Sequence, residues 1–250
     1  MISTVSTWAA LGAIGMALGT LAPLWGLTND PDHREHYLVL AGVTGVAAVA
    51  YTLMSLRIGD IGISGRVVSI PRYVDWLITT PLILLFLAML GGTGRGSLGR
   101  LIVADITLLV LGAVAVAIPG PIRWLAFAGG LAAFGVLVYE LYVRIPRLAT
   151  FTNERTRTLF ITLRNLTIAL WTLYPLVWVL APSGIGLLTR DMTMLVIAYL
   201  DLISKAAFVA LAVDGMDALV DAGRGATTPD AVTVDGGDAA ASDAGTDPAD

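Results

Sequence analysis

Seven apolar runs, separated by short clusters of charged residues, glycine and proline, divide most of this chain. They are residues 5–27, 37–56, 68–90, 101–118, 122–143, 159–180 and 192–213. Each run is close to the roughly 20 apolar residues that an α-helix needs to cross the hydrocarbon core of a bilayer. The runs are about twice as long as a transmembrane β-strand and lack the alternating polarity of a barrel. The sequence therefore predicts an all-α membrane protein, a bundle of seven transmembrane helices.

The composition of the 250 residues supports this prediction. Charged residues make up 14% of the chain, whereas about a quarter of the residues in soluble domains are charged. The chain has no cysteine, which excludes disulfides, thiolate metal sites and a cysteine nucleophile. No basic segment indicates nucleic-acid binding, and no catalytic motif indicates an enzyme. His33 and His36 lie close together in the first link, where we interpret them as solvated turn residues rather than as a metal site.

The last 30 residues differ from the rest of the chain. They contain seven of the 19 acidic residues and one of the 15 basic residues. A polar acidic segment of this kind is typical of disorder, because it has too few apolar side chains to form a core. We therefore expect a seven-helix membrane domain at 1–220 and an acidic disordered cytoplasmic tail at 221–250.

The basic residues of the links predict the orientation in the cell membrane. With the N-terminus outside, eight arginines of the links and tail lie on the cytoplasmic side and four on the outer side. Cytoplasmic loops of membrane proteins carry an excess of basic residues, so this orientation is favoured. No basic residue precedes the run 5–27, which we interpret as a retained span rather than as a signal peptide.

Ionisable side chains inside the predicted spans are the candidate functional residues, because such groups are costly in a bilayer. Lys205, the only lysine of the chain, lies in the middle of the last span. Asp201 precedes it by four residues and shares its helical face, and Arg72, Asp75 and Thr79 share a face of the third span. One interpretation is an interhelical ion pair with no further role. The other is that the buried amine of Lys205 forms a Schiff base with an aldehyde, which needs a nearby anion once it is protonated.

Aromatic residues in the sixth span suggest walls for such a ligand. Trp171, Tyr174, Pro175 and Trp178 recur at the spacing of one helical face. A stripe of this kind is often simple packing between helices. Together with a buried lysine, and with Trp76 on the third span, it predicts a pocket for a long, flat, conjugated molecule.

The segments 72–81 (RYVDWLITTP), 171–175 (WTLYP) and 200–205 (LDLISK) resemble those of the microbial rhodopsins of haloarchaea, and the resemblance extends over all seven spans. It implies all-trans retinal bound to Lys205 as a protonated Schiff base. Asp75 would be the counterion and proton acceptor, Asp201 the second counterion, and Arg72 would lie just outside them. The other residues implied to bind retinal are Trp76, Thr79, Thr80, Gly130, Trp171, Tyr174, Trp178 and Ser204.

Within this family the sequence is most similar to sensory rhodopsin II, or phoborhodopsin. Asp75 argues against a chloride pump, which has a neutral residue there. Proton pumps carry a second carboxylate eleven residues further along the third span, where this chain has Phe86. Ser204 matches a hydroxyl residue that in this subgroup hydrogen-bonds the tyrosine at Tyr174. At Asp105 the sequence differs from sensory rhodopsin II and resembles the proton pumps. We expect this carboxyl to be neutral and hydrogen-bonded to Thr80.

The resemblance implies a photoreceptor for phototaxis that drives the cell away from blue-green light. It would signal through a two-helix membrane transducer of the chemotaxis type, docked on the sixth and seventh spans near Thr189 and Tyr199. Interior hydrogen bonds or lipid contact would explain these two polar residues equally well. The alternative function is a slow, light-driven outward proton pump that lacks a cytoplasmic donor. The resemblance is compatible with two assemblies, a homo-oligomer and a 2:2 complex with the transducer.

Overall fold

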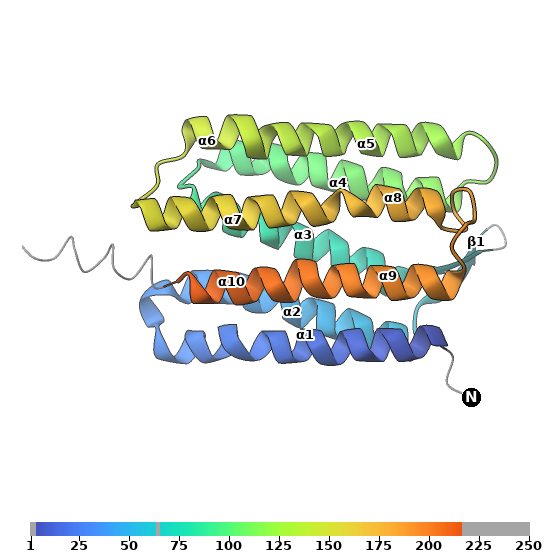
Figure 1. Ribbon diagram of the computed structural model, residues 1–250, viewed down its shortest axis with the longest axis horizontal. Coiled ribbons are helices and arrows are strands. Elements are labelled where there is room, and N and C mark those ends of the chain that lie inside the picture. Colours follow the sequence, from blue (N-terminus) through green and yellow to red (C-terminus); the bar gives the residue numbers. More distant parts are fainter. Residues whose placement is uncertain (1–3, 64–65, 217–250) are drawn as a thin grey trace, which may run out of the picture.

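The computed structural model describes residues 4–63 and 66–216, which form a bundle of long helices lying side by side (Figure 1). Seven helical segments of 21 to 27 residues in these ranges are long and apolar enough to span a membrane. The elements are α1 (Thr4–Asn29), η1 (Pro31–His33), α2 (Arg34–Ser55), β1 (Asp60–Ile63), β2 (Arg66–Ser69), α3 (Ile70–Leu90), α4 (Arg95–Ala117), α5 (Arg123–Tyr139), η2 (Glu140–Arg144), α6 (Ile145–Leu148), α7 (Glu154–Trp171), α8 (Leu173–Leu180), α9 (Arg190–Leu202), η3 (Ile203–Ala207) and α10 (Phe208–Asp214). The predicted seven-helix architecture is confirmed, and the predicted tail 221–250 lies outside the described residues.

A short β-hairpin between α2 and α3 was not predicted. Its strands β1 and β2 pair antiparallel, with Asp60 opposite Ser69 and Ile63 opposite Arg66. The third span therefore begins at Ile70, two residues later than the apolar run 68–90 suggested. The hairpin closes the end of the bundle where α9 begins (Figure 1).

Three of the spans are interrupted, and the interruptions have local causes. The sixth span divides at Thr172 into α7 and α8. Pro175 follows three residues later and has no N–H to donate to the carbonyl of Trp171, so the helical hydrogen bonding is broken there. The fifth and seventh spans contain the π-helical turns η2 and η3. Such turns insert an extra residue into a helix and are frequent at functional sites, and η3 contains Lys205.

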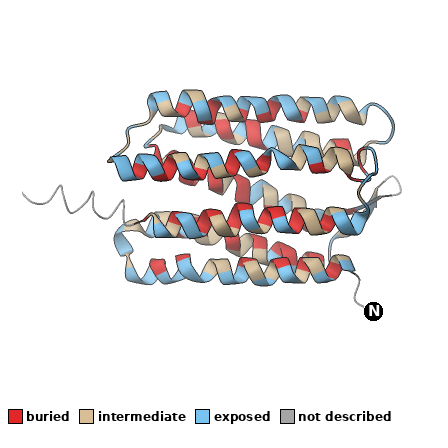
Figure 2. Cartoon of the chain, in the orientation of Figure 1, coloured by how far each residue is buried: buried red, intermediate tan, exposed pale blue. Residues whose placement is uncertain are grey.

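Burial follows the pattern of a membrane bundle. Buried residues line the faces that the helices turn toward one another, and exposed ones cover the outside (Figure 2). Large apolar side chains such as Leu18, Leu125 and Val103 are more than 60% exposed on the outer surface, which suits contact with lipid. Near the end of α3, Leu84, Phe86 and Leu87 belong to the main apolar core. Asp75, Asp201 and Lys205 are buried as well, at most 2% exposed.

Candidate functional site

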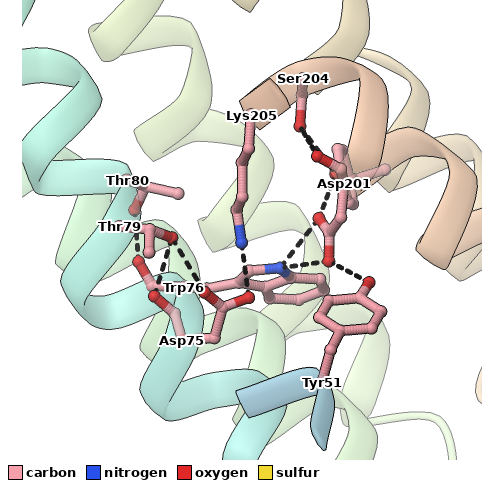
Figure 3. Close-up of polar contacts among 9 residues, drawn as sticks. Tyr51, Asp75, Trp76, Thr79, Thr80, Asp201, Ser204 and Lys205 are labelled. Atoms are coloured by element: carbon pink, nitrogen blue, oxygen red, sulfur yellow. Dashed lines mark hydrogen bonds and ion pairs between the residues drawn. The ribbon is translucent and has the colours of Figure 1, made fainter. Parts of the chain in front are cut away.

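An ion pair joins the third and seventh spans inside the bundle. The ammonium Nζ of Lys205, on η3, lies 2.5 Å from Oδ2 of Asp75, on α3 (Figure 3). The two side chains are 2% and 0% exposed. A buried charge needs a partner, and removing one member of such a pair leaves the other uncompensated, at a cost of about 3–5 kcal/mol. The convergence of these two residues, predicted from the sequence, is therefore present.

The threonines after Asp75 hold acidic groups in place. Thr79 donates to the backbone carbonyl of Asp75 at 2.8 Å, and its Oγ1 lies 3.3 Å from the carboxylate Oδ1. Thr80 Oγ1 lies 2.6 Å from Oδ2 of Asp105, on α4. This confirms the predicted contact between Thr80 and Asp105. Since both threonines also bond to the backbone one turn earlier, their side chains are fixed on α3.

Asp201 lies in a ring of donors. Tyr51 donates to its Oδ2 at 2.6 Å and Tyr174 to its Oδ1 at 2.5 Å. The indole N–H of Trp76 lies 3.2 Å from both carboxylate oxygens. These donors come from three different helices, α2, α3 and α8. Asp201 therefore lies in the same interior region as Lys205 and Asp75 but is held by other side chains.

Sequence reasoning missed Tyr51. It comes from α2 and is fully buried, and its hydroxyl reaches across the bundle to a residue 150 positions away. Its position in the otherwise apolar run 37–56 could have marked it as a residue with a polar partner, since a buried tyrosine hydroxyl usually finds one. Which carboxylate this hydroxyl meets is decided by the packing of the helices.

Ser204 and Arg72 are the remaining polar residues expected here. The hydroxyls of Ser204 and Tyr174 are 3.5 Å apart, at the outer limit of the hydrogen bond expected between them. Ser204 also donates to the backbone carbonyl of Asp201 at 3.2 Å. Arg72 lies one turn before Asp75 on α3, with Nη2 2.6 Å from Sδ of Met194 and a buried Nε that has no hydrogen-bond partner among the described residues.

A cavity of about 500 Å³ opens beside the amine of Lys205. Its volume and its largely apolar walls are those of a site for a small organic molecule. Phe127, which the sequence did not suggest, stacks on Trp178 with ring centroids 4.4 Å apart and extends the wall. Among the predicted residues, those that line the cavity are Arg72, Trp76, Thr80, Gly130, Trp171, Tyr174, Trp178, Asp201, Ser204 and Lys205. The buried indole N–H of Trp178 has no partner in the described part of the chain.

The donor set of this cavity fits an apolar aldehyde. Its one primary amine can form an imine, and the carboxylate of Asp75 lies against that amine to balance a positive charge. Flat rings of Trp76, Trp171 and Trp178 line the walls. The group that the sequence resemblance implies is therefore compatible with the residues present.

Thr189 and Tyr199 are both exposed and lie at different heights of the seventh span. The hydroxyl of Thr189 accepts from the backbone N–H of Met192 and so caps the N-terminus of α9. Tyr199 lies ten residues further along the same helix, about 15 Å away, and is 64% exposed. Capping explains the hydroxyl of Thr189, whereas no hydrogen bond in the described structure explains that of Tyr199.

Comparisons with known proteins agree with this geometry. Residues 3–219 match the family model described as bacteriorhodopsin-like protein. Sensory rhodopsin-2 of Halobacterium salinarum is 47% identical over 215 residues, covering 86% of this chain and 90% of that protein. Sensory rhodopsin-2 of Natronomonas pharaonis is 40% identical and covers 82% of this chain and 86% of that protein. The crystal structure of a thermophilic rhodopsin from Rubrobacter xylanophilus superposes with a TM-score of 0.83, at 34% identity, covering 88% of this chain and 99% of that one. The chain is a multi-pass membrane protein and belongs to the bacteriorhodopsin-like family.

Proposed function

We propose that this chain is a retinal-based photoreceptor for phototaxis, with a repellent response to blue-green light. The observation that carries the proposal is the buried pair of Lys205 and Asp75 beside an aromatic cavity. The relatives named sensory rhodopsin-2 support the receptor function, since they are 40–47% identical over most of the chain. Pump relatives such as archaerhodopsin-2 are less similar, at 34% identity.

Retinal, when bound, supplies the absorption of visible light and a change of shape by isomerisation from the all-trans form. The proposed attachment is a protonated Schiff base at Nζ of Lys205. Asp75 serves as counterion and Asp201 as second counterion, with Arg72 on their outer side. The remaining predicted residues would surround the bound molecule. Thr79 holds Asp75, and the others line the cavity: Trp76, Thr80, Gly130, Trp171, Tyr174, Trp178 and Ser204.

The proposed signal begins with a proton that moves from Nζ of Lys205 to Oδ2 of Asp75, which are in contact. This transfer neutralises both groups and removes the electrostatic link between α3 and η3. The sixth span is already divided at Thr172, where its helical hydrogen bonds are interrupted. Once the link is lost, α8 can tilt relative to α7, because a broken helix bends at low cost.

The proposed partner is a two-helix membrane transducer of the chemotaxis type. It docks on the outer faces of α8 and α9, where the exposed Tyr199 offers a hydroxyl among apolar residues. A polar contact inside lipid is favourable when the alternative is an unsatisfied group. In the proposed orientation the N-terminus is outside, and the link between α1 and α2 faces the cytoplasm.

One reconstitution experiment, with and without the transducer, distinguishes the receptor function from the pump function. We expect cells that contain this chain and its transducer to reverse their swimming in blue-green light, and cells without the transducer not to respond. Light-driven outward proton transport should be slow in vesicles that hold the chain alone, and slower when the transducer is present. Sustained transport in the complex, with no change in swimming, would establish the pump function instead.

Asp75→Asn is expected to move the absorption maximum to longer wavelength. Removing the carboxylate destabilises the positive charge at Lys205 Nζ more in the ground state than in the excited state, in which the charge is spread away from the nitrogen. Acidification of the wild type should produce the same shift, because it protonates Asp75. The measurement is an absorption spectrum as a function of pH. A spectrum unchanged in both cases would identify Asp201 or a bound anion as the main counterion.

A further inference from the structure

Three titratable residues cluster at the end of the bundle that holds the link between α1 and α2. Nδ1 of His33 lies 3.0 and 3.1 Å from the carboxylate oxygens of Asp30. Their side chains are 19% and 24% exposed, so both can reach solvent. The ring of His36 lies one turn further into α2, with its centroid 6.0 Å from that of His33. The two histidines are therefore not an isolated pair of surface turn residues, as the sequence suggested.

His36 is directed toward the apolar core. It is half-buried, and its ring meets the ring of Phe86 edge to face with centroids 5.9 Å apart. Phe86 in turn packs edge to face on Phe208 of α10, at 5.8 Å. Both phenylalanines are fully buried. The imidazole thus lies at the outer surface of an apolar layer that separates this end of the bundle from Lys205.

None of the four side chains that α3 contributes to this apolar layer can carry a proton. Phe86 is eleven residues from Asp75 on the same helix, about 16 Å along its axis. Ile83 lines the cavity of Lys205, and Leu84, Phe86 and Leu87 fill the space beyond it with side chains at most 1% exposed. A proton that returns to Lys205 from this side must therefore start from a group outside the layer. His36 is in direct contact with the layer, and a histidine takes up and releases protons near neutral pH.

We infer that His36 is the group that returns a proton to Nζ of Lys205, and that Asp30 and His33 recharge it from solvent. The inference rests on the proposed function, in which Lys205 loses a proton to Asp75. The proton leaves the His36 imidazolium, which becomes neutral, and Lys205 regains its charge. His33 then passes a proton to His36 and takes another from a hydronium ion of the solvent beside Asp30, which leaves a water molecule. Transfer is slow, because water must first enter the layer of Phe86 and Phe208.

The electrostatic surroundings of His36 define the pH dependence. The charged and titratable groups that act on it are His33, Glu35 and Asp30. Phe86, its ring contact on α3, brings no charge. Recovery of Lys205 should therefore depend on pH over the range in which imidazoles generally change charge, roughly pH 5 to 8.

The test compares His36→Phe with the wild type. Phenylalanine keeps an aromatic ring against Phe86 and removes only the titratable nitrogens, and His36→Gln provides a second, polar replacement. Flash photolysis measures how fast the state with neutral Lys205 decays, from pH 5 to 8, with and without azide as a diffusible proton carrier. We expect both variants to decay about tenfold more slowly without azide, less than the effect of an acid in direct contact with its acceptor. Their decay should also lose the pH dependence of the wild type.

A second measurement does not depend on the rate. Infrared difference spectra of protein with isotope-labelled histidine should show loss of an imidazolium band while Lys205 regains its proton, and this band should be absent in His36→Phe. Glu35→Gln is the control, since it removes an exposed charge beside His36 and should keep the band and the rate within about a factor of two.

Each possible outcome either supports or overturns the inference that His36 returns the proton. Azide that restores both His36 variants to the rate of the azide-treated wild type supports proton delivery, whereas variants that stay slow with azide would show that His36 acts through packing. Wild-type decay in His36→Phe, or an imidazolium band that persists in it, would overturn the inference but leave the proposed function intact. A wild type in which Lys205 never loses its proton would contradict the proposed function and this inference together.

Discussion

Lys205→Ala is expected to abolish the visible absorption band that the wild type gains when retinal is added. The chain has no other lysine, so no side-chain amine remains to form the imine. The measurement is the absorption spectrum of the purified variant after incubation with all-trans retinal. Because the loss is complete rather than partial, this variant has the largest expected effect of any single change.

Folding of that variant needs its own control, since Asp75 is left as a buried charge without its partner. The double variant Lys205→Ala with Asp75→Asn removes both charges and should fold while still forming no pigment. Lys205→Arg keeps the positive charge beside Asp75 and also lacks an amine that can react. A visible band in any of these three proteins, in the absence of an added free amine, would exclude Lys205 as the attachment site.

Phe86→Asp is expected to speed the return of the proton to Lys205 by about a hundredfold, the lower end of the range that a positioned acid contributes. The new carboxyl would lie on the same helix as Asp75 and about 16 Å from it. Leu84, Leu87 and Phe208 beside it are apolar and buried, which favours the neutral acid. The ring of His36, which also meets the ring of Phe86, is the group that would recharge it. Azide should accelerate the wild type strongly and this variant weakly.

Phe86→Leu is the matched control, because it loosens the apolar layer without adding a proton donor. If the leucine variant recovered as fast as the aspartate variant, water entry rather than proton donation would limit the rate. If the wild type already recovered within milliseconds and ignored azide, it would possess an efficient internal donor. The pump function would then be favoured over the receptor function.

The seven spans could be predicted from the sequence because a bilayer imposes a simple rule. Each span must be apolar over its length and must satisfy its own backbone hydrogen bonds, so run length and hydropathy are sufficient to locate it. The hairpin of β1 and β2 lies outside that rule. Its four-residue strands carry little pattern, and their pairing depends on how α2 and α3 place the two ends of the link.

Part of the candidate site could also be predicted from the sequence. Lys205 and Asp75 are costly inside a membrane unless they meet, so their presence in two spans already indicated contact. The contact between Thr80 and Asp105 was expected from the family resemblance, and the structure shows it. For an ionisable residue inside a membrane span, the chemical type and the depth in the span together leave few ways to pack the helices.

Tyr51, Phe127 and His36 show what only the tertiary structure decided. Each is an ordinary residue in its own helix, and its importance arises from a partner on another helix: Asp201, Trp178 and Phe86. Which faces of the helices meet depends on packing and on the extra residue of the π-helical turn η3, and neither is visible in local periodicity. The sequence by itself determined that this is a seven-helix membrane protein with one buried amine. The tertiary structure decided which side chains surround that amine, because contacts between distant segments depend on the rotation of each helix about its own axis.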